Sequence, residues 1–451
     1  MKFTIGINDV IVVSSENNYV PYVASVGVSS GKIVYIGTKK IFPEDATKVI
    51  DGRGKVMMPG LVNAHCHGDM TLARGIGDDL TLLEQNELYS GHNWFQKYIT
   101  TEDRYYSRQL TYCEALLSGT TFILENMYWD LDGKSVQAMS ETGIKGGLAL
   151  DIRKDFAKPE KFLDDDVFGR FEKESLEKGL VPVIGSVSEE DFEPALLNKI
   201  KKKLTELDLY STCHLAETDW RYEKVVNAHN KTPIEFLCEQ GMFTSKTIGS
   251  HVVKATDGDI ELLAKHQVSV VNTPLCEMKI ADGIFRGKDM LEKGVLVGLG
   301  TDGALWNNSN DIFREMKRML LIQTAANGIR AISKESILNM ATINGAKIFG
   351  KEQDFGSIEV GKSADFILIN IDQPHLWPIN LHEKYQNITS LLVSQVTGQD
   401  VSDVFINGER IVENRNLLTM DVKAIMRRVQ ETHENIIRNM TKDEAPACFF
   451  S

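Results

Sequence analysis

Two histidines separated by a single residue are the part of this chain best suited to chemistry. His65 and His67 stand in the run MMPGLVNAHCHGDM (57–70), where the apolar residues before them predict a short buried strand. Side chains two apart on a strand point the same way, so both imidazoles can face one point at the end of the strand. Two convergent neutral imidazoles suit a divalent metal. A strand face can also carry two histidines with no chemical role, so the pair alone is a weak signal.

Three later segments supply partners for this pair. His214 and Glu217 lie in CHLAET, His251 in GSHVV and Asp302 in GLGTDGA, each at the end of an apolar run. The carboxyl ends of parallel strands converge on one rim of a (β/α)8 barrel, which is where such barrels carry their active sites. Three histidines and an aspartate form a ligand set suited to zinc, with iron(II) and manganese(II) also compatible. The spacing therefore predicts a metal-bearing barrel.

The elements that must position these residues follow two patterns along the chain. Apolar strands alternate with helix-patterned stretches in the middle, for example at 101–118 and then 120–124, which is the rhythm of a parallel α/β barrel. A helix at 338–349 closes at Gly350. Short strand-like segments occupy both ends of the chain: 3–13, 23–28, 32–36, 48–51 and 55–58, then 364–370, 401–406 and 409–412.

We therefore predict an α/β protein with a metal-bearing (β/α)8 TIM barrel and a small β-sandwich domain formed from both termini. The predicted boundaries are 1–58 and 354–420 for the β-sandwich, 59–353 for the barrel and 421–451 for a C-terminal helical tail. Gly408 is predicted to turn the last two strands into a hairpin. The tail carries an amphipathic helix at 423–440.

Composition excludes several classes of partner. The net charge of −13 argues against nucleic acid, because phosphate binding requires a basic surface. The six cysteines show no paired spacing, which favours free thiols in a reducing compartment. The first residues lack the features of a signal peptide, and no apolar run reaches membrane-spanning length. These features predict a cytoplasmic protein with no membrane partner, and leave open whether it is a homo-oligomer.

Several long motifs in the same order resemble the amidohydrolase superfamily. They are PGLVNAHCHGDMTLARG (59–75), SGTTFILEN (118–126), HLAETDW (214–220), GVLVGLGTDGALWNNSNDIFREM (294–316) and NMATINGAKIFG with GSIEVGKSADFILIN (339–370). The resemblance is closest to the branch that holds S-adenosylhomocysteine and methylthioadenosine deaminases and the triazine chlorohydrolases. It implies a metal-bearing barrel with a β-sandwich from both termini, as the strand pattern predicts.

The resemblance also implies roles for individual residues. His65, His67, His214 and Asp302 match the ligands of a single metal, and no lysine stands where a bridging ligand would make a two-metal site. Glu217 matches the proton shuttle of the family. His251 matches the histidine that polarises the attacking water or the leaving group, and Asp302 is expected to move a proton as well as to bind the metal.

Two segments depart from the nucleoside deaminases of this branch. Residues 183–194 (VIGSVSEEDFEP) lack the histidine that reaches the purine, and Gln96 or Lys97 stands where a glutamate holds the ribose. Trp94, Trp306 and Arg153 are the candidate substrate contacts, and Phe285 and Met127 are further candidates for an apolar pocket. Each of these predictions has a structural alternative. The tryptophans could pack in the core, and Arg153 could form a salt bridge at the rim of the barrel.

The residues predict a hydrolytic deaminase. A bound metal lowers the pKa of water to about 7, so that hydroxide can attack a ring carbon that carries an amino group. The expected small-molecule substrate is an amino-substituted N-heterocycle: a purine, an adenosine derivative, a pterin, a pyrimidine or a triazine. Displacement of chloride or an alkylamine from a triazine-like ring is the alternative. A non-catalytic binding protein of the same fold is a third hypothesis, disfavoured because the ligand set is complete.

Overall fold

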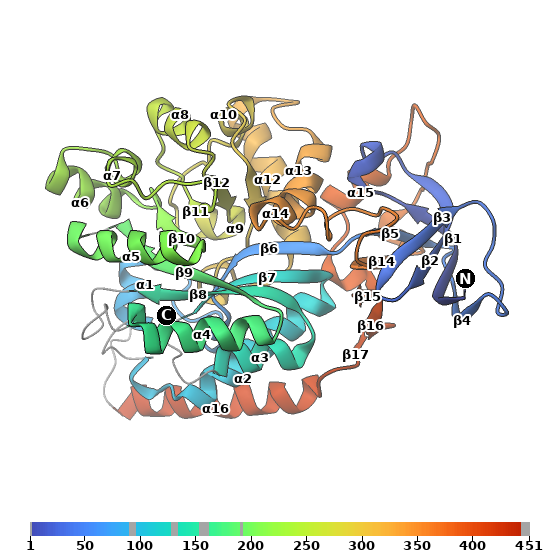
Figure 1. Ribbon diagram of the computed structural model, residues 1–451, viewed down its shortest axis with the longest axis horizontal. Helices are drawn as coiled ribbons and strands as arrows, with labels where there is room; N and C mark the ends of the chain where they lie inside the picture. Colours follow the sequence, from blue (N-terminus) through green and yellow to red (C-terminus); the bar gives the residue numbers. More distant parts are fainter. Residues whose placement is uncertain (1, 90–95, 128–133, 153–161, 190–192, 443–451) are drawn as a thin grey trace. The chain divides into compact units, whose positions relative to one another are not determined.

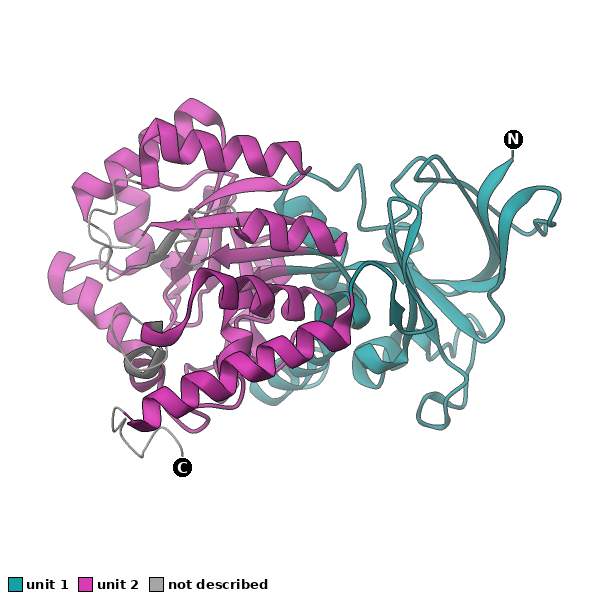
Figure 2. Cartoon of the chain, turned by 90° about the horizontal axis from the view of Figure 1, so that it is seen from below, with its two compact units in different colours: residues 1–63, 114–122, 311–420 teal, residues 64–113, 123–310, 421–451 magenta. Residues whose placement is uncertain are grey.

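The computed structural model describes residues 2–89, 96–127, 134–152, 162–189 and 193–442. The chain divides into two compact units, which Figure 2 colours separately: residues 1–63, 114–122 and 311–420, and residues 64–113, 123–310 and 421–451. The boundaries predicted from the sequence (1–58, 59–353, 354–420 and 421–451) remain our proposal for the domains.

Eight parallel strands form a nearly closed barrel, with helices in the links between them (Figure 1). The strands follow one another in chain order around the sheet: β6 (Leu61–Cys66), β7 (Thr120–Met127), β8 (Lys145–Ile152), β9 (Val181–Ser188), β10 (Tyr210–Leu215), β11 (Thr247–His251), β12 (Ser269–Asn272) and β13 (Val297–Leu299). Every residue of β6 and β7 is buried, as expected for parallel strands covered on both faces. The predicted barrel is confirmed.

The connecting segments between the strands carry the helices that the alternating pattern predicts. Those of the second unit are α1 (Leu82–Tyr89), α3 (Lys134–Thr142), α4 (Asp165–Glu177), α5 (Pro194–Leu207), α6 (Asp219–His229), α7 (Pro233–Glu239), α8 (Asp257–Lys265), α9 (Pro274–Lys279), α10 (Gly287–Glu292) and α11 (Ala304–Asn307), while α2 (Thr101–Leu117) begins in the second unit and ends in the first. Those of the first unit that follow are α12 (Ile312–Asn327), α13 (Lys334–Ala341), α14 (Ile343–Ile348) and α15 (Ile388–Ser394).

A mixed nine-stranded sheet is built from both termini, as predicted. Its strands are β1 (Phe3–Val12), β2 (Tyr22–Ser29), β3 (Lys32–Gly37), β4 (Ala46–Asp51), β5 (Lys55–Pro59), β14 (Phe366–Asn370), β15 (Val401–Ile406), β16 (Glu409–Glu413) and β17 (Asn416–Leu417). The N-terminal β5 pairs antiparallel with the C-terminal β14, which joins the two ends of the chain. Phe366 and Phe405 stack at 4.5 Å in its core.

A buried ion-pair network also joins the two ends of the chain within this sheet. Asp403 on β15 is fully buried and accepts hydrogen bonds from Lys55 on β5 (2.7 Å) and from Arg410 on β16. The hairpin between β15 and β16 turns at Asn407 and Gly408, both with positive φ, which is the geometry of a type I′ turn. The hairpin predicted at Gly408 is therefore present.

One predicted helix is wrong. The stretch 338–349 is not a single helix, because α13 ends at Ala341 and α14 begins at Ile343. Thr342 between them has φ −135° and ψ −94°, outside the helical region, and its hydroxyl donates to the carbonyl of Leu338 at 2.6 Å. Threonine side chains can compete in this way for the hydrogen bonds of the helical backbone. The helical spacing of the apolar residues continues across Thr342, so the sequence pattern gives no sign of the break.

The C-terminal helix α16 (Val422–Lys442) extends one residue before and two residues after the predicted 423–440. It buries Ile425, Val429, Thr432, Ile436 and Met440 along one face. His433 donates from Nδ1 to the carbonyl of Leu72 at 2.7 Å. Leu72 belongs to the 3-10 helix η2 (Gly68–Ala73), which directly follows His67, so α16 braces the segment next to the candidate metal ligands.

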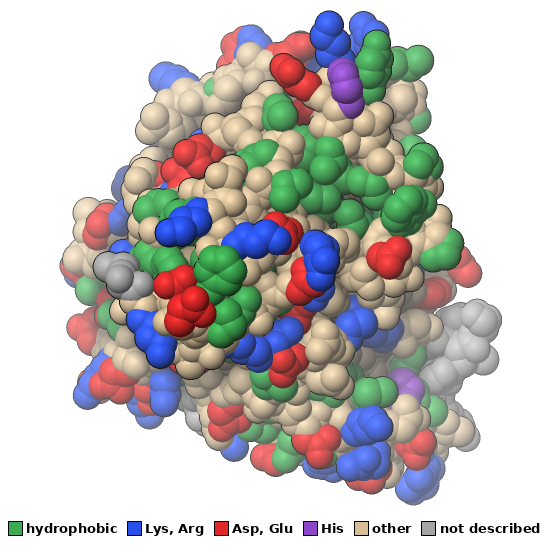
Figure 3. Space-filling model, turned by 90° about the vertical axis from the view of Figure 1, so that its right-hand side faces the viewer, with side chains coloured by type: hydrophobic (Ala, Val, Ile, Leu, Met, Phe, Trp, Pro, Cys, Tyr) green, Lys and Arg blue, Asp and Glu red, His purple; other side chains and the backbone are tan. Residues whose placement is uncertain are grey.

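Charged side chains are interspersed over the face drawn in Figure 3. Lysine and arginine side chains lie among aspartate and glutamate side chains there, so the described residues of that face form no continuous basic surface for a phosphate backbone. Among the described helices, none is both long and apolar enough to cross a membrane.

Candidate metal centre and acid–base groups

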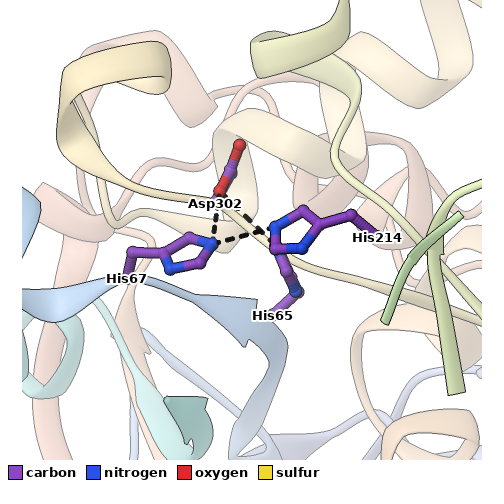
Figure 4. A group of neighbouring side chains, drawn as sticks. All are labelled: His65, His67, His214 and Asp302. Carbon is purple, nitrogen blue, oxygen red and sulfur yellow. Dashed lines mark hydrogen bonds and ion pairs between the residues drawn. The ribbon is translucent and has the colours of Figure 1, made fainter. Parts of the chain in front are cut away.

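The structure brings the four predicted ligands together. His65 lies in β6, His67 directly after it, His214 in β10 and Asp302 three residues beyond β13, and their side chains point toward one another in Figure 4. One ligand atom from each lies within 4.8 Å of the others. Four residues from three separate parts of the chain thus form one compact cluster.

The distances within the cluster suit a single ion. His67 Nε2 lies 3.2 Å from His214 Nε2, and Asp302 Oδ1 lies 3.4 Å from the Nε2 atoms of both His65 and His67. Zinc–nitrogen bonds of about 2.0–2.1 Å in tetrahedral geometry hold neighbouring ligand atoms roughly 3.3 Å apart. The residues present therefore fit a mononuclear zinc site.

Backbone contacts place Asp302 against His65. The amides of Thr301 and Asp302 both donate to the carbonyl of His65, at 3.1 and 3.0 Å, and Asp302 has φ +60°. A Cβ added at Gly300 would lie 2.8 Å from the Cβ of His65, so glycine is required for this approach. The segment after β13 thereby returns to β6, and the last strand is joined to the first at a candidate ligand.

Residues of β7 and β11 contact the Nδ1 atoms of the first two histidines. His67 donates from Nδ1 to the carbonyl of Asn126 at 3.1 Å, which leaves the lone pair on Nε2 facing the cluster. The Asn126 amide nitrogen and Ser250 Oγ each lie 2.9 Å from His65 Nδ1. The sequence analysis singled out neither Asn126 nor Ser250 as a contact of the candidate ligands, although Asn126 stands in one of the quoted motifs.

Burial sets the protonation states of the cluster. It lowers the pKa of His67 to about 4 and that of His214 well below its usual value, so both imidazoles are neutral at pH 7. For Asp302 burial alone would raise the pKa, but the hydrogen bond to His65 and the nearby His67 hold it well below its ordinary range. Neutral imidazoles beside a carboxylate are the state in which such residues bind a metal.

Glu217 lies in the short link between β10 and α6 and is almost completely buried. Its Oε1 atom lies 3.7 Å from His251 Nε2, and its Oε2 atom is ion-paired with Arg221. The solvated position considered as the alternative for Glu217 is wrong. Arg221, which the sequence reasoning missed, stands four residues later on the first turn of α6, and this spacing is the signal that could have revealed the pair.

His251 ends β11 and is completely buried, with φ +71°. Its Nδ1 atom lies 3.0 Å from Thr273 Oγ1 and 3.7 Å from Glu277 Oε1. Burial alone would lower the pKa of His251, but the nearby carboxylates of Glu217 and Glu277 raise it to about 10. These two carboxylates therefore favour the protonated form of the His251 ring.

The predicted substrate contacts have different outcomes. Trp306 lies in α11 with its ring 5.4 Å from that of His67, and its indole N–H has no hydrogen-bond partner among the described residues. Trp94 and Arg153 lie outside the described residues. Phe285 and Met127 are both buried. The substrate roles of all five stay predictions.

Comparison with known proteins agrees with this geometry. The model of the amidohydrolase family matches residues 56–411. A 5-methylthioadenosine/S-adenosylhomocysteine deaminase of Thermoanaerobacter pseudethanolicus is 33% identical over 420 residues, which are 92% of this chain and 94% of that protein. The protein of the same name from Desulforudis audaxviator is 32% identical over 425 residues, 93% of this chain and 96% of its own length.

Solved structures share the whole fold. An adenosine deaminase from Xanthomonas campestris with bound zinc has a TM-score of 0.88 at 26% identity and covers 97% of this chain and 99% of its own. An atrazine chlorohydrolase from Arthrobacter aurescens complexed with zinc has a TM-score of 0.83 at 20% identity, covering 95% and 100%, which shows the fold alone. With a family model matched over most of its length and relatives that cover more than nine tenths of it, this chain belongs to the amidohydrolase family.

Proposed function

We propose that this protein is a zinc-dependent hydrolytic deaminase acting on the amino group of an adenosine-type nucleoside, with 5′-methylthioadenosine and S-adenosylhomocysteine as the first candidate substrates. The observation that carries the proposal is the cluster of His65, His67, His214 and Asp302 with Glu217 and His251 beside it. The names of the 33% and 32% identical relatives support the substrate class. The zinc in the adenosine deaminase structure supports the choice of metal.

His65, His67, His214 and Asp302 would hold the zinc ion, which would lower the pKa of a bound water to about 7. Glu217 takes a proton from the attacking water and passes it to the ring nitrogen beside the carbon that bears the amino group. A C–O bond forms as the ring nitrogen accepts the electron pair, and the carbon becomes tetrahedral. The ion pair with Arg221 holds the Glu217 carboxylate in place for both transfers.

The second half of the reaction expels the amine. His251 donates a hydrogen bond toward the added oxygen and stabilises the charge that develops there. Asp302 moves the hydroxyl proton to the amino nitrogen, the C–N bond breaks with its electron pair, and ammonia leaves. The ring carbonyl then forms, and the proton delivered by Glu217 remains on the ring nitrogen.

The test is an ammonia-release screen of the full-length protein loaded with zinc or with manganese. The substrates are 5′-methylthioadenosine, S-adenosylhomocysteine, adenosine, free purines, pterins, aminotriazines and a chlorotriazine. The wider range follows from the departures at 96–97 and 183–194. We expect ammonia and one ring carbonyl per turnover from the adenosine derivatives. Chloride release from the chlorotriazine without deamination, or no turnover by a protein with full metal content, would overturn the proposal.

A further inference from the structure

Helix α9 follows β12, a strand for which the sequence predicts no functional residue at its carboxyl end. Two consecutive residues of this helix, Cys276 and Glu277, are nevertheless buried against the candidate site. Cys276 donates from Sγ to Asp302 Oδ2 at 2.9 Å, and Glu277 faces His251. One short helix therefore contacts two of the groups assigned to the reaction.

The carboxylate of Glu277 is held firmly by its own segment. Oε1 accepts a hydrogen bond from the Thr273 amide at 3.0 Å and lies 3.3 Å from the Thr273 hydroxyl, which donates to it. Oε2 accepts from the side-chain amide of Asn272 at 2.5 Å. Thr273 is thus a shared contact, because its hydroxyl also lies 3.0 Å from His251 Nδ1.

His251 lies between two carboxylates. Its Nδ1 atom is 3.7 Å from Glu277 Oε1, and its Nε2 atom is 3.7 Å from Glu217 Oε1. A carboxylate on one side of an imidazole keeps a proton on that nitrogen and directs the other nitrogen toward the reacting groups. Glu277 has the position to do this for His251, and its exposed fraction of 2% excludes bulk water from competing.

We propose that Glu277 is a positioning residue that orients the His251 imidazole toward Glu217 and the substrate. The inference rests on the proposed function, in which His251 stabilises the added oxygen. Glu277 touches neither substrate nor metal in this role and acts only through His251. The competing interpretation is structural, since a glutamate in the first turn of a helix stabilises that turn through the helix dipole and its hydrogen bonds to nearby amides.

A double-mutant cycle on the zinc-loaded full-length enzyme separates the two interpretations. Glu277→Gln should lower kcat by roughly 10- to 100-fold, the scale of an outer-shell carboxylate, with KM and zinc content close to wild type. His251→Gln should lower kcat by itself, and the combined variant should lose no more than His251→Gln does, because Glu277 acts through His251. Losses that multiply, or a kcat of Glu277→Gln within twofold of wild type, would overturn the inference.

Asp259→Asn is the matched control. Asp259 on α8 is also buried and accepts hydrogen bonds from the amide and hydroxyl of Thr256, as Glu277 does from Thr273. Among the described residues, its side-chain hydrogen bonds are to Thr232 and Thr256, outside the candidate site. It should lower the melting temperature and leave kcat unchanged. If Glu277→Gln does not fold, Glu277→Asp keeps the charge and withdraws the carboxylate from His251 by one methylene, and the same cycle applies.

Crystal structures of the wild type and of Glu277→Gln provide a readout that does not depend on activity. The His251 ring should rotate away from Glu217 in the variant, and an unmoved ring would count against a positioning role. If the wild-type protein deaminates nothing, the proposed function fails while this structural comparison still tests the effect of Glu277 on His251.

Discussion

Cys276 donates a hydrogen bond from its thiol to Oδ2 of Asp302 at 2.9 Å, while Oδ1 of the same carboxylate faces the histidines. A thiol is an uncommon donor to a candidate metal ligand, and this one is completely buried. This hydrogen bond connects Oδ2 of Asp302 to α9, and Oδ1 stays available as a metal ligand.

Removing this donor should weaken both metal binding and turnover. Cys276→Ala leaves Oδ2 without its hydrogen bond and frees the carboxylate to rotate, so we expect a loss of roughly 10-fold or more in zinc affinity and kcat. Cys276→Ser restores an O–H donor and should recover most of the loss. Competition with a zinc chelator and steady-state kinetics measure the two effects, and an alanine variant equal to wild type would contradict the role.

Asp302→Asn should abolish turnover and sharply reduce the zinc content while the fold is retained. Asp302 lies three residues beyond the end of β13, and an amide oxygen is a much poorer ligand than a carboxylate. Metal analysis measures the zinc content, circular dichroism tests whether the fold is retained, and the ammonia assay measures turnover. Loss of soluble, folded protein would count against a purely catalytic and metal-binding role.

Glu217→Gln should keep its metal and lose turnover by a factor of about 100 or more, the usual scale for a general acid–base group. The structure adds a second expectation, because the substitution removes the Glu217 charge that pairs with the buried guanidinium of Arg221. We therefore also expect a lower melting temperature, measured by calorimetry. Glu223→Gln, on the exposed side of α6, is the control and should change neither quantity. Loss of the metal from Glu217→Gln would show instead that Glu217 is a ligand.

Trp306→Phe should raise KM several-fold and leave the zinc content unchanged. Phenylalanine preserves the ring beside His67 but removes the indole N–H, which has no hydrogen-bond partner among the described residues. A hydrogen bond to substrate contributes about 1 kcal/mol, which corresponds to roughly 5-fold in affinity. An unchanged KM for the best substrate of the screen would mean that Trp306 is only a packing residue.

The stability of the terminal sheet should depend on pH through Asp403. Burial alone would raise the pKa of Asp403, but its hydrogen bonds from Lys55, Ser402 and Arg410 lower it. A lowered pKa in the fold means that the unfolded chain binds the proton first, at about pH 4. The stabilisation is therefore complete above about pH 5 and is lost as the pH falls through the folded value.

Asp403→Asn tests this dependence. It should reduce the free energy of unfolding by about 2 kcal/mol at pH 7, because the partly buried cations of Lys55 and Arg410 lose the Asp403 carboxylate. The difference from wild type should shrink as the pH falls below 4. Urea unfolding of both proteins at several pH values measures it, and a difference independent of pH would contradict the assignment.

The barrel and its cluster of candidate ligands could be predicted because they depend on local patterns. Apolar runs that end in His65, His214 or His251 place those residues at the same rim once the strands are parallel. Other residues near the site could not be predicted, because only the folded structure brings them into contact with it. Glu277 and Cys276 follow a strand without a predicted ligand, and nothing in their spacing shows that they contact His251 and Asp302. The helix break at Thr342 was missed for a similar reason, because a side-chain hydrogen bond leaves the apolar period intact.

The carbonyl of His65 accepts the amides of both Thr301 and Asp302, so the same residue that faces the metal also fastens the last strand to the first. We therefore expect metal binding at His65 to stabilise these two hydrogen bonds. Amide hydrogen exchange at positions 301 and 302 should slow when zinc binds, more than at strand ends remote from the site. The exchange rates of these two amides would then report metal occupancy without any substrate.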